Sequence, residues 1–558
     1  MAISLTTPHL AGLKNNPDFH QTAHLLKKFS SLELNQPSVI KNYHNLLLYY
    51  AAFPGNKQIL DLATAEIQRI AAVINAASHN KKLNWKKSLT ASGMASTELI
   101  GSYSRPITGW LLEIFPSGVA YHSSGASKET IRTILQILLP PIEYEKWSQG
   151  ELGLRARLER ISGLHQPTHL VNWLLKLFKD SQLPDLVKEE LFQQLNVFVH
   201  WKLENDFYNR SFLRCPIQHV YYQHFIKKKV ASTRMVKQKI GRPVLFSLTQ
   251  KKDFINIARA SLALQYRETD PVTYADENEL ELFDMGNGLQ IVLMGMIKER
   301  RLSLETYVGY MAFKNGVPVS YGGGWIWGRR CKIGVIIYLP FRRGESARIF
   351  CQVLRLYHHY FGCFHFIVKP YQFGKGNQEG LKSAAFWFYY KLGFRPTNDT
   401  IKKEAEIEWV KLKKDKKYRT PIKQLQHFTT CNVEWKINKK SFPDFDAGKI
   451  SLLVSNAINK KFVGDRQLAI SSCQKSMNKL FRAASLKKDN FYQKEVLANW
   501  GLLLLVLGDI EKWSANQKGM LVKLIKLKQA GKERDYVLQL KKHNRLWLSM
   551  KEAINKQV

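Results

Sequence analysis

The sequence contains no apolar run long enough to cross a lipid bilayer. The longest run covers residues 502–507, whereas a membrane-spanning helix needs about 20 apolar residues. Trp500 and Asp509 flank this run, which is typical of a helix buried in a protein core. Residues 1–16 lack a basic stretch followed by an apolar core. We therefore expect neither a membrane span nor a secretory signal.

Cysteine is scarce, and its spacing forms no paired motif. The chain of 558 residues has six cysteines and no Cys-x-x-Cys sequence. Scattered free thiols in a large chain are typical of a reducing compartment rather than of a disulfide scaffold. A cytoplasmic location is therefore expected.

Several catalytic and ligand-binding motifs are also absent. The sequence has no Gly-x-Ser-x-Gly turn, no Walker-type phosphate loop and no repeat of fixed period. His358, His359, Cys363 and His365 lie close together in the chain, but the pattern places the first two on a helix end and His365 on a strand. Because no second ligand group follows at a zinc spacing, no metal site is expected.

What the sequence has in excess is positive charge. The formal net charge is +39, and residues 397–558 carry 34 Lys and Arg against 16 Asp and Glu. Such a field raises the local concentration of polyanions without sequence preference. One interpretation is a polyanionic partner, such as RNA, tRNA or an acidic protein. The other is that the lysines only keep a large surface solvated.

Hydrophobic periodicity divides the chain into four parts. Apolar residues recur at spacings of three and four in 22–34, 38–53 and 57–79, which predicts amphipathic helices. The predicted parts are a mainly helical N-terminal region at 1–205 (irregular or short-stranded at 88–127, then helical again), a basic connecting segment at 206–260, an α/β domain at 261–435 and a helical, basic C-terminal domain at 449–558.

The connecting segment interleaves basic and aromatic residues. Residues 208–259 carry 12 Lys and Arg and a single acid, and they include Tyr221, Tyr222 and Phe225. Such a pattern can hold a phosphate backbone and stack on bases. Residues 268–284 carry seven acids and no Lys or Arg, so the two oppositely charged blocks can also neutralise each other.

From residue 307 the pattern changes to strands. Residues 307–313 and 317–327 flank Asn315-Gly316, the dipeptide that most favours a tight hairpin turn. The second strand contains the run Gly322-Gly323-Gly324. A bulge, or the close approach of another backbone or a ligand, is expected at such a run.

A strand-to-helix joint follows the hairpin. Residues 332–339 are almost continuously apolar, which predicts a central strand that ends at Pro340. A helix is expected at 346–361, then a strand at 364–368 and a helix at 383–392. Backbone N–H groups at a helix start, with the helix dipole behind them, form an anion site.

The residues of this joint suit a phosphate. Gly344 permits close approach of the backbone, and Arg342 and Arg343 add positive charge. Ser346 can cap the helix or donate to a phosphate oxygen. An Arg-Gly-Glu-Ser turn can equally well be an ordinary helix cap.

The order of these elements resembles the core of the GNAT N-acetyltransferase superfamily. The closing run Tyr389-Tyr390-Lys391-Leu392-Gly393-Phe394 matches that family's Tyr-x-x-Leu-Gly-Phe motif, and Ala385 stands where the family usually has alanine. The resemblance covers residues 300–396. It implies a multidomain α+β/α-β protein whose GNAT-like mixed sheet, with flanking helices, lies in the chain between a mainly helical N-terminal region and a helical, basic C-terminal region.

The resemblance also implies a substrate and a set of site residues. In the family, the strand equivalent to 332–339 pairs with the pantetheine arm of acetyl-CoA or another acyl-CoA, and the turn after it holds the pyrophosphate. The residues implied to bind acyl-CoA here are Ile336, Ile337, Tyr338, Leu339, Arg342, Arg343, Gly344 and Ser346. Tyr389 is implied to protonate the departing thiolate, a role that suits a phenol with a pKa near ~10.

Two functions are compatible with this pattern. The first is transfer of an acyl group from acyl-CoA to an unidentified amine, with water as the base because no Asp or Glu lies on the strand before Pro340. The second is an inactive GNAT-like fold that acts as a binding or scaffold module, including for nucleic acid. Ser346 and Arg348 favour the second, because the family usually has glycine or alanine at these positions.

Overall fold

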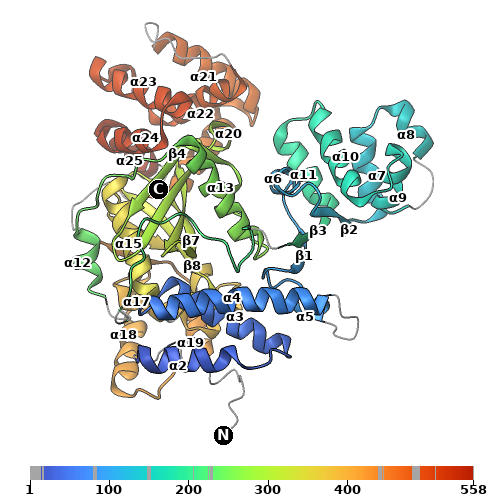
Figure 1. Ribbon diagram of the computed structural model, residues 1–558. Coiled ribbons are helices and arrows are strands. Elements are labelled where there is room, and N and C mark those ends of the chain that lie inside the picture. The colour runs from blue at the N-terminus through green and yellow to red at the C-terminus, as the bar shows by residue number, and fades with distance from the viewer. Residues whose placement is uncertain are drawn as a thin grey trace. The chain divides into compact units, whose positions relative to one another are not determined.

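The computed structural model describes residues 14, 18–78, 85–147, 152–204, 207–223, 225, 230–342, 344–437, 443, 445–480, 490–508 and 510–556. Within these residues the chain forms 24 α-helices, an eight-stranded sheet and a three-stranded sheet (Figure 1). The expected mixture of helices and sheet is confirmed, and the GNAT-like identity of the sheet stays a prediction. None of the described helices is both long and apolar enough to cross a membrane.

The chain divides into two compact units. Unit 1 comprises Met1–Ile226, Phe246–Thr273 and Phe313–Val319, and unit 2 comprises Lys227–Leu245, Tyr274–Ala312 and Ser320–Val558. The predicted connecting segment at 206–260 is therefore shared between the units. Its unit 1 part contains α13 (Leu248–Ala263), and its unit 2 part contains α12 (Ser232–Lys237).

Unit 1 begins with three amphipathic helices at the places that the periodicity predicts. They are α2 (Phe19–Ser30), α3 (Pro37–Ala52) and α4 (Lys57–Ser78), followed by the short α5 (Trp85–Leu89). Asp18 caps α2 by accepting from the N–H groups of His20 and Gln21. Pro37 starts α3, where a missing N–H is not needed.

A three-stranded antiparallel sheet also belongs to unit 1. Its order is β1 (Thr97–Ser102), β3 (Val197–Leu203) and β2 (Val119–Ser124). The helices between its strands are α6 (Arg105–Ile114), α7 (Lys128–Leu138), α8 (Pro141–Trp147), α9 (Leu154–Ser162), α10 (Pro167–Asp180) and α11 (Asp185–Leu195).

Two of these elements differ from the sequence-based expectation. The helix α6 lies in the stretch expected to be irregular, and Ser104 caps it by accepting from the N–H of Ile107. The strand β3 lies in a stretch expected to be helical. Val199 and Trp201 are fully buried on one side of β3 and Lys202 is exposed, but the apolar Phe198 between the buried residues hides the alternation.

The eight-stranded sheet has the order β10-β11-β9-β8-β7-β6-β5-β4. Strands β8 and β9 run parallel, whereas β4–β5, β7–β8, β9–β11 and β10–β11 are antiparallel. The strands are β4 (Ala275–Asp284), β5 (Leu289–Met296), β6 (Thr306–Lys314), β7 (Val317–Trp327), β8 (Arg330–Ile337), β9 (His365–Val368), β10 (Arg395–Pro396) and β11 (Val433–Lys436).

The predicted elements of this region are confirmed to within about two residues at each end. They are the hairpin β6–β7, the central strand β8, the strand β9, and the helices α15 (Ser346–Tyr360) and α17 (Ala385–Leu392). Asn315 and Gly316 have φ angles of 46° and 78°, as a tight turn with two left-handed residues requires. The Asn315 amide also donates to the carbonyl oxygens of Ala52 and Tyr221, which explains why the hairpin tip belongs to unit 1.

Of the three explanations expected for the glycine run of β7, close approach of another backbone is confirmed at Gly322, a bulge is absent, and aromatic side chains lie against all three glycines. A Cβ on Gly322 would lie 2.3 Å from the carbonyl oxygen of Gly334 and 2.7 Å from the hydroxyl of Tyr310. The other two glycines face the rings of Tyr307 and Tyr357. The β7–β8 register continues unbroken through all three. The Tyr310 hydroxyl donates to the Gly334 carbonyl at 3.0 Å, so a side chain from β6 crosses β7 and reaches β8.

The remaining helices of unit 2 lie between the last strands of the sheet or after them in the chain. Between β9 and β11 the chain forms α16 (Gln378–Lys382), α17, α18 (Asp399–Lys414) and α19 (Ile422–Phe428). The last helices are α20 (Ala447–Phe462), α21 (Arg466–Leu480), α22 (Phe491–Leu507), α23 (Ala515–Ala530), α24 (Glu533–Lys542) and α25 (Asn544–Asn555).

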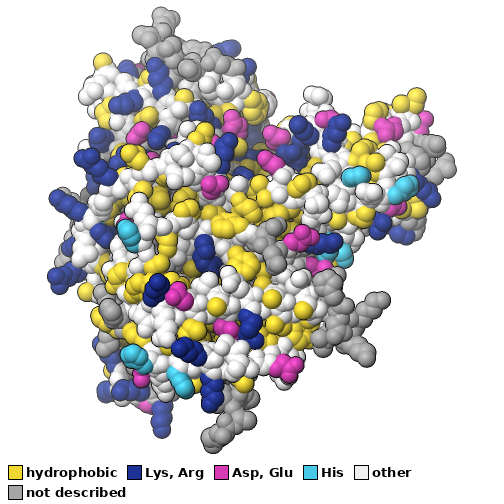
Figure 2. Space-filling view, in the orientation of Figure 1, with side chains coloured by type: hydrophobic (Ala, Val, Ile, Leu, Met, Phe, Trp, Pro, Cys, Tyr) yellow, Lys and Arg dark blue, Asp and Glu magenta, His cyan; other side chains and the backbone are white. Residues whose placement is uncertain are grey.

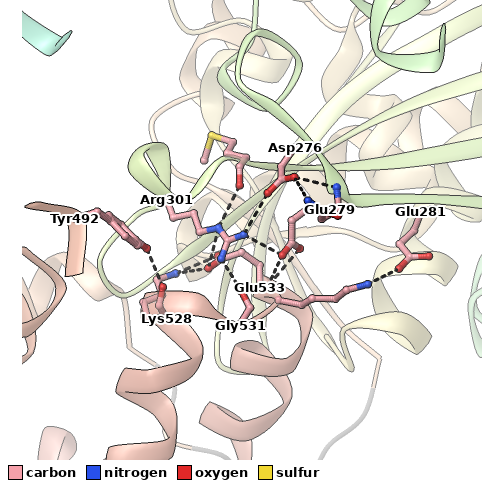
Figure 3. Close-up of polar contacts among 11 residues, drawn as sticks. Asp276, Glu279, Glu281, Arg301, Tyr492, Lys528, Gly531 and Glu533 are labelled. Atoms are coloured by element: carbon pink, nitrogen blue, oxygen red, sulfur yellow. Dashed lines mark hydrogen bonds and ion pairs between the residues drawn. The ribbon is translucent and has the colours of Figure 1, made fainter. Parts of the chain in front are cut away.

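A buried charge cluster joins these last helices to the sheet (Figure 3). Arg301, whose side chain is 2% exposed, contacts Glu279 of the edge strand β4 at 2.9 Å. It also donates to the carbonyl oxygen of Gly531, between α23 and α24, at 2.7 Å. Lys528 of α23 contacts the Glu533 carboxylate of α24 at 2.9 Å, and both side chains are almost fully buried.

The cluster is stable only while its members remain paired. Burial raises the pKa of Glu279 to about 7, although Arg301 beside it acts in the opposite direction. Removing one partner of such a buried pair leaves an uncompensated charge and costs about 3–5 kcal/mol. The C-terminal helices and the sheet consequently share one compact unit.

We expect Gly322→Ala to lower the thermal unfolding midpoint measured by differential scanning calorimetry. The new methyl group would overlap a backbone atom of β8, and overpacking of this kind costs roughly 1–3 kcal/mol. Gly519→Ala in α23 is the matched control, because nothing lies within 4 Å of its Cβ and alanine favours a helix by about 1 kcal/mol. An unchanged midpoint for Gly322→Ala would mean that a methyl group fits between β7, the Tyr310 side chain and the Gly334 carbonyl.

Candidate functional site

The parallel strands β8 and β9 pair over only a short length. Their register consists of Arg330↔His365, Cys331↔Phe366 and Lys332↔Ile367. Beyond Lys332, β8 continues for five more residues to Ile337 and remains paired with β7. Among the described residues, no strand pairs with this part of β8 on the side of β9.

The sequence after β9 explains why the pairing stops. β9 ends at Val368, and the chain enters the 3-10 helix Pro370–Phe373. Pro370 has no N–H to continue a ladder, and its fixed φ favours the turn. Gln372 of this 3-10 helix then lies beside β8, because a Cβ on Gly334 would be 2.8 Å from its side-chain nitrogen.

The predicted pantetheine-binding residues lie at the end of residues 333–337 of β8, which pair with β7 but, within the described part of the chain, have no partner strand on the β9 side. We call these residues the unpaired part of β8. Ile336 is half-buried, and Ile337 and Tyr338 are buried. Leu339 starts the 3-10 helix Leu339–Phe341 and is 63% exposed. An exposed apolar side chain also occurs after β9, where Tyr371 is 56% exposed. Both strand ends therefore present apolar surface to solvent.

Of the predicted phosphate-binding residues, Arg342 and Gly344 lie in the turn before α15, and Ser346 starts that helix. Arg342 lies in the turn, donates from Nε to the carbonyl oxygen of Ile337 at 3.0 Å and forms an ion pair with Glu379. Gly344 is half-buried in the same turn. Arg343 lies outside the described residues. Sequence reasoning missed Glu379, which is 37 positions from Arg342 in the chain and carries no local signal of this contact.

The start of α15 already has a negative charge of its own. Glu345, not Ser346, is the N-cap residue, and Ser346 is the first residue of the helix. The Glu345 side chain is 3% exposed and lies 3.9 Å from the guanidinium of Arg348, which is also buried. A carboxylate at a helix N-terminus takes part of the favourable field that a phosphate would use.

Tyr389 lies in α17 among aromatic rings. It is 2% exposed and packs edge-on against Phe350 of α15 at 5.7 Å between ring centres and against Phe394 at 5.9 Å. Burial alone raises its pKa well above the usual value for tyrosine. No hydrogen bond of its hydroxyl is seen in the part of the chain that the structure describes. The phenol is consequently protonated at neutral pH.

Tyr310 of β6 lies near Tyr389 and bonds to β8. Burial raises the pKa of Tyr310, and the nearby Tyr389 raises it further. The Tyr310 hydroxyl in turn donates to the Gly334 carbonyl of β8.

Metal binding has no support among the described residues, which contain no group of three or more His, Cys, Asp or Glu side chains that could hold an ion. His358 Nδ1 is bonded to the carbonyl oxygen of Cys363, and His365 Nε2 lies 2.7 Å from Glu434. The two histidines therefore bond to different groups, a backbone carbonyl and a carboxylate.

The basic segment at 208–259 is only partly described. Residues 226–229, which include the run of three lysines, lie outside the described residues. Tyr221 is half-buried, and Lys314 stands over its ring at 4.9 Å. In Figure 2, Lys and Arg side chains are scattered among uncharged ones on the visible face. A polyanionic partner therefore stays a prediction.

The acidic block at 268–284 has described partners outside the basic segment. Glu268 bonds to Ser104, Glu279 to Arg301 and Glu281 to Lys532. A contact between the two blocks does exist in the backbone, where the Val244 N–H donates to the Leu282 carbonyl at 2.7 Å.

We expect Glu379→Gln to tighten the binding of acetyl-CoA, measured by isothermal titration calorimetry. The substitution releases the Arg342 guanidinium from an exposed ion pair, and such a pair is worth roughly 1 kcal/mol or less, so the gain should be about two- to fivefold. Glu495→Gln, at an exposed position of α22, is the control. Weaker binding in the Glu379 variant would show that the pair positions Arg342 instead of competing with the phosphates.

Three comparisons of the chain with known proteins were made. No protein-family model matches it, and neither a curated protein nor a solved structure matches it. The resemblance to the GNAT superfamily therefore rests on the sequence motifs and stays a prediction.

Proposed function

We propose that the protein binds acyl-CoA between β8 and the segment after β9 and transfers the acyl group to an amine. The observation that carries the proposal is that β8 continues for five residues after its last pair with β9. The backbone of a strand presents N–H and C=O groups to any extended partner at such an edge. The pantetheine arm of coenzyme A contains amides that suit this edge.

In this proposal, each part of the site binds a different part of acyl-CoA. The edge of β8 up to Leu339 orients the pantetheine arm, and Arg342 and Gly344 meet the pyrophosphate. Holding the thioester and the amine in line supplies most of the rate enhancement. Arg342 must exchange Glu379 for a phosphate oxygen on binding, because Glu379 is its partner in the ligand-free protein.

Tyr389 would act on the leaving thiolate. The amine attacks the thioester carbonyl, the C–S bond breaks, and the sulfur leaves with the electron pair. Burial keeps the Tyr389 phenol protonated, so it is available as a hydrogen-bond donor to the developing thiolate. Because its pKa is raised, complete proton transfer is less favourable than for an ordinary tyrosine. Donation of a hydrogen bond is therefore its main contribution.

The amine would lose its proton to water. Glu305 is the acid paired with β8, and its carboxylate is held by Lys332 at 2.9 Å. Asp446 contacts the same lysine at 3.3 Å. Both carboxylates are thereby already partners of a cation.

The alternative function is a GNAT-like fold that no longer uses a cofactor and acts as a binding or scaffold module. The buried pair of Glu345 and Arg348 at the start of α15 favours this alternative. A second anion brought to this helix start would meet the Glu345 carboxylate. The two functions are separated by a direct measurement of cofactor binding.

Titration of the full-length protein with acetyl-CoA by calorimetry should show saturable binding. Tyr389→Phe should leave the affinity unchanged and lower the turnover by about 10²–10³-fold, the usual range for the loss of one hydrogen bond to a developing anion. Turnover is measured as thiol release over a panel of amines.

Tyr390→Phe is the matched control, because Tyr390 lies on the same helix but packs against Trp409 and Arg395. Its turnover should equal that of the unmodified protein. No binding heat at cofactor concentrations on the order of 1 mM would sink the acyltransferase proposal and leave the scaffold function. Equal turnover in the Tyr389 variant would remove Tyr389 from the mechanism.

A further inference from the structure

The helix α18 has an outward face with exposed aliphatic side chains. Its inner side buries Ile401 and Ala405. Ile407 and Val410 are 60% and 50% exposed, and residues three apart lie on the same face of a helix. Lys403, four residues before Ile407, and Lys414, four residues after Val410, extend this face in both directions. We call the four residues 403, 407, 410 and 414 the α18 face.

Positive charge surrounds the α18 face. Residues 411–423 contain seven Lys and Arg and one acid, Asp415. The lysines at 413, 414, 416 and 417 are exposed. Of the four acids of α18, Glu404 lies 3.0 Å from His427 and Glu408 lies 2.7 Å from Lys411. The other two, Asp399 and Glu406, are exposed, and the lysines outnumber them.

Nucleic acid is a poor match for this surface. Binding of single strands relies on open aromatic rings for stacking. Tyr418, among the lysines that follow α18, is half-buried and donates its hydroxyl to Glu408 at 2.7 Å, and the aromatic residue of α18 itself is Trp409. Its ring is stacked on Trp387 at 5.6 Å, and Lys413 stands over it at 5.5 Å. Exposed Ile and Val side chains contribute nothing to contacts with phosphates. The α18 face therefore lacks the stacking surface and has aliphatic groups in its place.

A folded protein partner is also a poor match. A stable protein interface buries about 800 Å² on each partner, and two aliphatic side chains on a convex helix supply much less apolar area. A lipid surface has no such requirement, because many lysines add small attractions to anionic headgroups while a few apolar side chains enter the interface. Charge and aliphatic character together favour a membrane.

We propose that the α18 face and the lysines that follow it dock the protein on the surface of a membrane that contains anionic phospholipid. The aliphatic pair enters the headgroup boundary, and the lysines contact the phosphates and carboxylates of the lipids. The binding is peripheral and reversible. This inference is independent of acyl-CoA binding.

The test is co-sedimentation of the full-length protein with vesicles at physiological ionic strength, about 0.15 M. Vesicles of phosphatidylcholine with phosphatidylserine should bind the protein, and vesicles of phosphatidylcholine alone should not. Replacing lysines 403, 414, 416 and 417 by Gln should weaken binding by roughly tenfold or more. The double variant Ile407→Ser and Val410→Ser should weaken it by at least threefold, since each buried CH₂ contributes about 0.8 kcal/mol.

Two control variants make the result specific. Gln at lysines 494, 523, 526 and 551 removes the same number of exposed charges from the C-terminal helices. Ile142→Ser removes an aliphatic side chain that is 84% exposed in α8. Both should bind vesicles as the unmodified protein does.

Three outcomes would overturn the proposal. The first is no binding to vesicles with phosphatidylserine. The second is equal loss in the lysine variant and its charge-matched control, which would show that net charge alone acts. The third is binding that ignores the Ile407 and Val410 changes while poly(U) RNA competes, which would assign the lysines to nucleic acid.

Discussion

The site depends on one constraint, the end of the parallel pairing between β8 and β9 after Lys332 and Ile367. A parallel pair that continued to Ile337 would satisfy the β8 backbone with another strand and leave nothing for a ligand. The chain instead turns into a 3-10 helix at Pro370. Tyr310, which crosses β7 at Gly322, fixes the position of β8 from the other side. The candidate site is thus a consequence of where a strand stops and of how its neighbour is anchored.

Two features of the site act in opposite directions. The free edge of β8 and the buried, protonated Tyr389 favour a thioester substrate. Glu345, buried at the start of α15 beside Arg348, takes a place that a phosphate would use. The balance depends on whether Arg342 and the turn can hold the pyrophosphate without the helix start. The free edge of β8 favours binding of acyl-CoA in the proposed function. The Glu345 carboxylate at the start of α15 makes this binding weaker than it would be at a turn without an acid.

Local sequence patterns predicted the part of the fold on which this argument rests. The Asn315-Gly316 turn, the apolar run of β8 and the helices α15 and α17 each carry a signal within a few residues, because turn chemistry and hydrophobic periodicity are local. The same logic failed at β3, where Phe198 hides the alternation. For the β7 glycines it anticipated the close approach of another backbone at Gly322 but not the rings of Tyr310 and Tyr357, because those rings come from other elements.

Contacts between distant parts of the chain could not be predicted at all. The ion pair of Arg342 and Glu379 and the cluster of Arg301 with Glu279 and Gly531 join residues far apart in the sequence. Charged residues carry no periodic signal that reveals their partners. The sequence therefore identified the candidate residues of the turn but not the groups that already occupy them.

Hydrogen–deuterium exchange, measured with and without acetyl-CoA, tests the central claim most directly. The account predicts slower exchange of the backbone amides at 333–337 of β8 when acetyl-CoA is present, with unchanged exchange in β5 (Leu289–Met296). Amides of β8 that exchange equally fast with and without saturating acetyl-CoA would contradict it.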